Sequence, residues 1–115
     1  MADGQHQGEL EDLFHRAIVG MYEWARDGAG YNAKRFIQMV AERGGLETAR
    51  QLLHASTVSE GFTALWEKGR LDLAMEFQVL QTQFEGLFTE EEREIARERL
   101  RAYRFDVDRH LQGAN

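Results

Sequence analysis

The side chains that could do chemistry are spaced in a way that disfavours a metal site. The four histidines are His6, His15, His54 and His110. No two of them stand three or four residues apart, so no pair can bind a metal from one helix face. The chain of 115 residues has no cysteine, which excludes disulfides, thiolate catalysis and cysteine-bound zinc. The sequence therefore predicts no metal site.

Motifs for covalent catalysis and for phosphate binding are missing too. Neither the G-x-S-x-G nucleophile motif nor the glycine-rich loops G-x-x-x-x-G-K-[ST] and G-x-G-x-x-G occur. The 20 Asp and Glu residues are expected on solvated faces, and nothing singles out a catalytic pair among them. We expect no cofactor and no catalytic residue. An enzyme built from scattered acidic, tyrosine or histidine groups is the least favoured hypothesis.

A row of arginines near the C-terminus could contact phosphate groups. It consists of Arg93, Arg97, Arg101 and Arg104, which fall within about 80° of a helical wheel. Lys34 and Arg35, in the first turn of an earlier predicted helix, could add to such contacts. However, Glu90, Glu94 and Glu98 each stand three residues before an arginine, as in ordinary surface ion pairs. A solvated face is therefore favoured over a phosphate-binding face.

The stretch "LWEKGRLDL" (65–73) holds a second candidate site. Glu67, Arg70 and Asp72 flank a glycine stop, and packing of the core does not require them. The favoured interpretation is that Arg70 bridges Asp72 or Glu67 and locks the corner. The alternative is that Arg70 presents its guanidinium to a partner carboxylate or phosphate beside Tyr31 and Trp66. The candidate partner-binding residues are Tyr31, Arg35, Trp66, Glu67, Arg70 and Asp72.

Hydrophobic periodicity predicts that helices position all these residues. The apolar side chains from Leu10 to Ala25 fall within about 140° of a helical wheel. Glycines and capping residues divide the rest of the chain into shorter helices. The predicted helices are 10 to about 27, 33–43 with Asn32 as N-cap, about 46–55, 60–68 capped by Ser59, about 73–81 capped by Asp72, and 90–104 with a Thr89–Glu92 capping box.

The fold class that follows is all-α, a compact single-domain bundle of five or six short-to-medium helices. No proline, which breaks helix interiors, occurs in the chain, and no segment has the alternation of a strand. Residues 83–88 stay open between helix and turn. We expect a flexible N-terminal tail at 1–8, one helical domain at 9–105 and a C-terminal tail at 106–115. In the fourth helix, Phe62, Leu65 and Trp66 are expected in the core.

The central segment 47–73 resembles a helix-turn-helix, because "HASTVS" could form the turn between two short helices. The second of these helices would be the one that enters a DNA groove. Here it reads "EGFTALWE", which offers almost no donors to base edges and two carboxylates that repel phosphate. The geometry of the motif is therefore expected without DNA reading.

Three stretches carry a family resemblance: "YNAKRFIQMVAERGGLETARQLL", "GFTALWEKGRLDLAMEFQVL" and "LFTEEEREIARERL". Together with Tyr103 they resemble a widespread family of short bacterial all-helical proteins of unknown function. The match extends over about residues 10–105. The resemblance implies one intact helical domain and no established activity. It also implies relatives that occur alone or attached to nucleic-acid-processing and defence proteins.

The leading hypothesis is a non-catalytic helical interaction module, a small accessory subunit or adaptor that binds another protein or a second copy of itself. The alternative is a nucleic-acid-associated accessory protein, for example of a restriction, CRISPR or other defence system, that uses the arginine row. The net charge of −6 disfavours a nucleic-acid partner. No apolar run approaches the roughly 20 residues of a membrane span, and no secretory signal is apparent, so we expect a cytoplasmic protein without a membrane partner.

Overall fold

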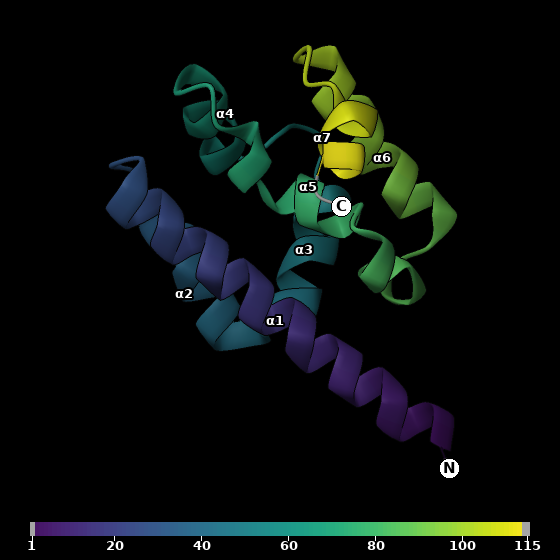
Figure 1. The fold of residues 1–115 in the computed structure, drawn as a ribbon. Coiled ribbons are helices and arrows are strands. Elements are labelled where there is room, and N and C mark those ends of the chain that lie inside the picture. The colour runs from purple at the N-terminus through teal and green to yellow at the C-terminus, as the bar shows by residue number, and fades with distance from the viewer. Residues whose placement is uncertain (1, 114–115) are drawn as a thin grey trace.

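Nine helical elements make up the computed structural model, which describes residues 2–113 of the chain and the side chains of residues 7–111. In chain order they are α1 (Ala2–Gly28), α2 (Lys34–Arg43), α3 (Gly45–Leu53), α4 (Glu60–Glu67), the 3-10 helix η1 (Leu71–Leu73), α5 (Met75–Val79), the 3-10 helix η2 (Thr82–Leu87), α6 (Glu90–Ala102) and α7 (Val107–Gly113). Figure 1 shows α1 running across the molecule, with its N-terminal end extending past the other helices. No strand occurs in residues 2–113, so the predicted all-α class is confirmed.

The long helix α1 packs one apolar face on the rest of the protein. It has 27 residues and begins at Ala2. The sequence predicts a tail at residues 1–8, and residue 1 lies outside the described part. Apolar residues at three- and four-residue intervals give it a buried stripe. Phe14 and Ile18 in this stripe are fully buried. The ring of Phe14 meets those of Phe84 and Phe88 edge-on, with centroids 5.1 and 5.2 Å apart.

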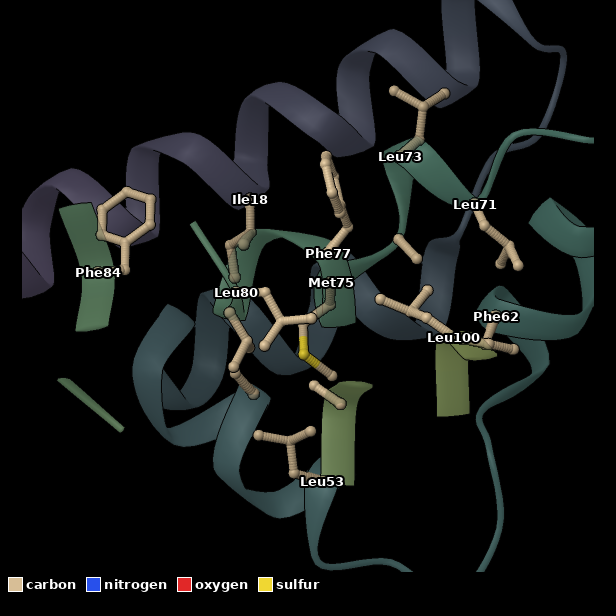
Figure 2. Close-up of a cluster of buried hydrophobic side chains, with 14 of the residues drawn as sticks. Ile18, Leu53, Phe62, Leu71, Leu73, Met75, Phe77, Leu80, Phe84 and Leu100 are labelled. Carbon is tan, nitrogen blue, oxygen red and sulfur yellow. The ribbon is translucent and has the colours of Figure 1, made fainter. Parts of the chain in front are cut away.

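The short helix α5 lies at the centre of the fold. All of its residues are buried, and it packs against α1, α3 and α6. Figure 2 shows Met75 and Leu80 among side chains from other elements, including Leu53 of α3 and Leu100 of α6. A helix covered on every side in this way joins the surrounding helices into one core.

The helix predicted at about 73–81, with Asp72 as its cap, forms only in part, as the shorter α5. The chain instead forms η1, passes through Ala74 in an extended conformation, and only then enters α5. The Asp72 carboxylate accepts hydrogen bonds from Arg70 and caps no helix. Every residue from Leu73 to Leu80 is buried. The segment therefore has no exposed face from which a helical period could be recognised.

Two adjacent glycines make the sharp junction between α2 and α3. Gly44 ends α2 with a φ of 86°, a conformation that favours glycine. Gly45 begins α3 against α1, where a Cβ atom would lie 2.8 Å from the Cα of His15 and 3.0 Å from the Cδ1 of Ile18. The Gly45 amide donates to Nδ1 of His15 at 3.0 Å. Close packing of α3 on α1 therefore requires glycine at position 45.

Arg99 ties α6 to the C-terminal end of α3. Its Nη1 donates to the Leu52 carbonyl at 3.0 Å. Its Nη2 donates to the carbonyls of Leu53 and Ala55 at 3.1 and 2.8 Å. Carbonyls at a helix C-terminus lack partners within the helix, so the guanidinium supplies the missing donors. Arg99 also contacts Glu76 of α5, and so it joins three helices.

A second polar cluster joins the start of α6 to α3. Thr89 and Glu92 form the predicted capping box, with bonds of 3.0 and 2.9 Å. The Glu92 carboxylate also lies 2.9 Å from Nε2 of His54 and 3.9 Å from Nε of Arg50. Burial alone would raise the pKa of Glu92, but the Thr89 amide, His54 and Arg50 together lower it below its ordinary value. The ionised carboxylate is therefore the form that holds this contact.

The second helix begins differently from the prediction. The predicted N-cap, Asn32, does not cap α2; its Oδ1 accepts a 2.7 Å hydrogen bond from the Tyr22 hydroxyl. Ala33 takes the cap position without a side-chain bond, and α2 begins at Lys34. Asn32 therefore fixes the loop between α1 and α2 to the side of α1.

The C-terminal part contains a helix within the range predicted as a tail, 106–115, of which residues 114–115 lie outside the described part. Residues 107–113 form α7, and Val107 is buried. The ring of Phe105 meets that of Phe77 edge-on at 5.4 Å and stacks on His110 at 4.1 Å. This segment therefore covers part of the core beside α5.

Candidate binding groove

A groove of about 540 Å³ separates two groups of helices. The C-terminal half of α1, the loop after it and α2 form one wall, while α4 and the loop before it form the other. Residues 73–76, from the end of η1 to the start of α5, line its floor. The volume falls in the range of roughly 300–1,000 Å³ that is typical of ligand-binding pockets.

The wall from α1 and α2 is mostly apolar. Met21 of α1, Tyr31 of the loop, and Phe36 and Met39 of α2 line it. All four are half-buried, so they keep apolar surface that is available to a ligand. The two methionines are flexible and polarisable, which allows this wall to adapt to the shape of what it binds.

The opposite wall begins at the N-terminus of α4, which a side-chain cap holds in place. Ser59 caps α4 as predicted, with its Oγ accepting from the amide of Phe62 at 3.1 Å. Phe62 and Leu65 line the groove, and both are buried as the sequence predicts. Leu73 and Met75 extend the apolar surface onto the floor. The groove therefore has apolar sides that the core itself holds in place.

One carboxyl group lies at the floor of the groove. Glu76 lines the groove, although its exposed fraction is only 2%. Its Oε2 accepts from Nη1 of Arg99 at 3.3 Å, the longest of the bonds that this guanidinium makes. Burial raises the pKa of Glu76, and the hydrogen bond from its own backbone amide and the nearby Arg99 charge oppose the shift only in part.

Charged residues of opposite sign line the two walls. Lys34 and Arg35 stand at the start of α2, and Glu60 stands at the start of α4. None of the three forms an ion pair with another residue whose side chain the structure describes. Burial and then the negative charge of Glu60 raise the pKa of Tyr31, and both residues line the groove.

The predicted corner at 65–73 is locked internally. Arg70 donates from Nε and Nη2 to the two carboxylate oxygens of Asp72, both at 3.0 Å, which is the favoured structural interpretation. The Arg70 guanidinium also lies 5.2 Å from the centre of the Trp24 ring. Neither Arg70 nor Asp72 lines the groove.

Trp66 and Glu67 lie outside the groove as well. Trp66 is 46% exposed, so its predicted place in the core is wrong. Its ring contacts that of Tyr103 edge-on, with the centroids 5.2 Å apart. Glu67 is exposed beside Lys68 at the outer face of α4. Of the six predicted partner-binding residues, the groove therefore brings together Tyr31 and Arg35, while Trp66, Glu67, Arg70 and Asp72 lie apart from it.

The arginine row is largely occupied by contacts within the protein. Arg93 pairs with Glu90 at 3.6 Å and Arg97 with Glu94 at 2.6 Å, as predicted. The third predicted pair does not form, because Arg101 approaches Asp108 of α7 at 3.9 Å instead of Glu98. Arg104 follows α6 with a φ of 63° and is exposed. The row is therefore not a continuous set of free cations.

Two residues that matter most for the site were missed by sequence reasoning. Glu76 stands in the otherwise mostly apolar stretch "LAMEFQVL" (73–80), and a single carboxylate in such a run is the signal that could have marked it. Arg99 lies among several similar charges, and no local pattern separates it from them. Their pairing depends on a contact between positions 23 residues apart.

The described side chains contain no group of three or more metal-binding residues. None of the helices in residues 2–113 has both the length and the apolar character needed to cross a bilayer. Comparison with protein-family models, with curated proteins and with solved structures found no match.

Proposed function

We propose that this protein is a non-catalytic interaction module that binds one amphipathic helical segment of a partner protein in the groove. The observation that carries the proposal is a preformed apolar groove whose charged residues, Lys34, Arg35 and Glu60, form no ion pair among the described side chains. Helix-in-groove recognition uses such a surface, with apolar anchors of the ligand entering the groove and charged residues meeting its rim.

The apolar walls support a helical ligand because they offer adaptable contacts on one side and fixed contacts on the other. Met21 and Met39 can change rotamer around an entering side chain. Phe62 and Leu65 are held by the core and supply a rigid surface. A groove of about 540 Å³ can take the apolar side chains of one or two helical turns.

A nucleic-acid partner is less well supported. Helix α4 contains no Arg, Lys, Asn or Gln that could donate to base edges. Arg93 and Arg97 already pair with glutamates, and the net charge is −6. The helix-turn-helix-like geometry predicted for residues 47–73 stays a prediction, and it does not enter the proposed function.

The family resemblance involves several residues of the groove. Tyr31, Asn32, Phe36 and Met39 are among the residues that carry the resemblance, and they also line the groove. We propose that the chain belongs to that family of short bacterial proteins, and that the relatives share the groove.

The proposal is tested by selecting binders from a displayed library of helical peptides against the purified protein. We expect selected peptides to carry apolar residues at i, i+3 or i+4, and i+7. Ala33 of the groove wall and Ala41 of α2, which lies outside the groove, provide a matched pair of variants. Ala33→Trp should weaken binding by about tenfold or more, which is about 1.4 kcal/mol, and Ala41→Trp should leave it unchanged. An empty selection, or binders indifferent to Ala33→Trp, contradicts the proposal.

A further inference from the structure

We propose that the groove selects a helix with two differently charged edges: an acidic edge toward Lys34 and Arg35, and a lysine or arginine toward Glu60 and Glu76. This inference rests on the proposed function, since it names the chemistry of the partner helix. It adds a specificity that apolar packing alone would not give.

One side of the groove is positively charged. Lys34 and Arg35 are exposed and line the groove from the first turn of α2. The first turn of a helix also carries the positive end of its dipole. No acidic side chain is present in the first turn of α2 to neutralise either source of charge. This wall therefore attracts a carboxylate on the facing edge of a ligand.

The wall formed by α4 carries a negative charge. Glu60 is exposed in the first turn of α4 and lines the opposite wall without a basic partner among the described side chains. It is close enough to Tyr31 to raise the pKa of that hydroxyl. Its charge therefore acts on the space between the walls, where it would attract a cationic edge.

The floor of the groove carries the carboxyl group of Glu76. Arg99 directs three of its four hydrogen bonds at the carbonyls of Leu52, Leu53 and Ala55, and only the longest reaches Glu76. These carbonyls carry the partial negative charge of a helix C-terminus, which offsets part of the guanidinium charge. Glu76 therefore remains incompletely compensated at the floor.

The chemistry of the side chain that could reach this floor is restricted. Met39, Phe62 and Leu65 line the same groove as Glu76, so a group that enters it needs an apolar stem. Lysine and arginine have such stems, with a charged group at the end. We therefore expect one of these two residues on the edge of the helix that faces α4 and α5.

Three synthetic helical peptides of about 18 residues test the inference. They share one leucine face and differ only in the edges that border it: both acidic, both basic, or one acidic and one basic. Binding to the full chain is measured by fluorescence anisotropy at low and high salt. We expect the mixed peptide to bind about fivefold more tightly than the other two at low salt, and the difference to shrink at high salt.

Charge-reversed proteins then assign the edges. The double variant Lys34→Glu, Arg35→Glu should come to prefer the basic peptide, and Glu60→Lys should come to prefer the acidic one. Glu76→Gln, which keeps an acceptor for Arg99, should weaken the mixed peptide several-fold. Arg109→Glu is the control, because Arg109 is exposed on α7 outside the groove and forms no ion pair among the described side chains. It should leave all three affinities in their wild-type order.

The outcomes separate this inference from the proposed function. If all three peptides bind equally and lose affinity with Ala33→Trp, the charge selection is wrong and the groove function stands. The same conclusion holds if the reversals leave the preference unchanged. If no peptide binds at any salt concentration, both the inference and the proposed function are contradicted.

Discussion

Arg99 and Glu76 form the ion pair with the least exposed side chains among the described residues, at 12% and 2%. Burial of two charges costs free energy unless hydrogen bonds satisfy them. The carbonyls at the end of α3 provide three of the bonds to Arg99. The pair therefore supports both the fold and the floor of the groove, and its loss should affect stability first.

Replacing Arg99 should destabilise the protein strongly. Arg99→Met keeps much of the side-chain volume but removes one donor from Glu76 and from each of three carbonyls. We expect the free energy of unfolding to fall by about 3–5 kcal/mol, as for other broken buried pairs. Urea denaturation followed by circular dichroism measures the change.

Arg101 provides the matched control for this variant. It is on the same helix, is exposed, and approaches Asp108 only at 3.9 Å. Arg101→Met should therefore change stability by no more than about 0.5 kcal/mol. Adding Glu76→Gln to Arg99→Met should recover part of the loss, because the unpaired buried carboxylate is gone. Equal effects of the two arginine variants would show that the Arg99 contacts are not needed.

Glu92 should make the fold sensitive to acid. Its pKa is lower in the folded protein than in the unfolded chain, so the unfolded chain binds the proton more readily. The stabilisation is present in full above the ordinary glutamate pKa of 4.5, and it is lost as pH falls through the lowered folded value. We expect the free energy of unfolding to decrease over this acidic range. Urea denaturation at a series of pH values measures it.

The glutamine variants isolate this contribution. Glu92→Gln should flatten the acidic part of the curve, while Glu91→Gln, an exposed neighbour in the same turn, should keep the wild-type slope. Glu76 has a raised pKa, so its contribution has the opposite sign, being fully present below the ordinary pKa and lost as pH rises through the folded value. A curve for Glu92→Gln that parallels the wild-type curve would exclude the proposed role of this carboxylate.

At the scale of the elements, the closest helix contact depends on a missing side chain. A Cβ at Gly45 would meet the backbone of His15 at 2.8 Å, whereas a Cβ at Gly20 of α1 would meet nothing within 4 Å. Gly45→Ala should force α3 away from α1 and cost about 1–3 kcal/mol. Gly20→Ala should stabilise α1 by up to about 1 kcal/mol, because alanine favours helix. Thermal and urea unfolding compare the two, and effects of the same sign would contradict this account.

The elements with local signals could be predicted from the sequence. Ser59 and the Thr89–Glu92 box cap helices where expected, because a cap is formed within four residues. The glycine pair at 44–45 ends α2 for an equally local reason. The break between η1 and α5 could not be predicted, because residues 73–80 are all buried and show no helical period. Asn32 was assigned as a cap, but a contact with Tyr22 on the preceding helix determines its conformation.

The groove was predictable only in pieces. Tyr31 and Arg35 were candidates, but nothing local indicates that Glu60 lies across from them. The corner at Arg70 and Asp72 was a candidate site because of its charges, but these two residues form an ion pair with each other. A site formed by separate segments depends on tertiary packing, and the same packing buries Glu76 where an apolar residue is expected.

The whole molecule has its groove and its C-terminal contacts on different elements. Helices α1, α2 and α4 form the walls, while α6, α7 and Phe105 cover other parts of the core. Helix α5 links the two, because Glu76 lies at the groove floor and the next residue, Phe77, contacts Phe105. Removing contacts on the C-terminal side should therefore lower the stability of the fold more than it changes binding in the groove.

Ending the chain after Arg104 tests this separation. The truncation removes Phe105 from the ring of Phe77 and removes the buried Val107, so we expect the free energy of unfolding to fall by about 3 kcal/mol. Arg109→Ala, an exposed change within α7, should stay within about 0.5 kcal/mol of wild type.

The truncated protein, measured where it is still folded, should keep the order of affinities for the three peptides, because no groove residue is removed. A truncated protein as stable as the full chain would show that residues 105–113 contribute little to the core. A changed order of affinities would show instead that α7 acts on the groove through α5.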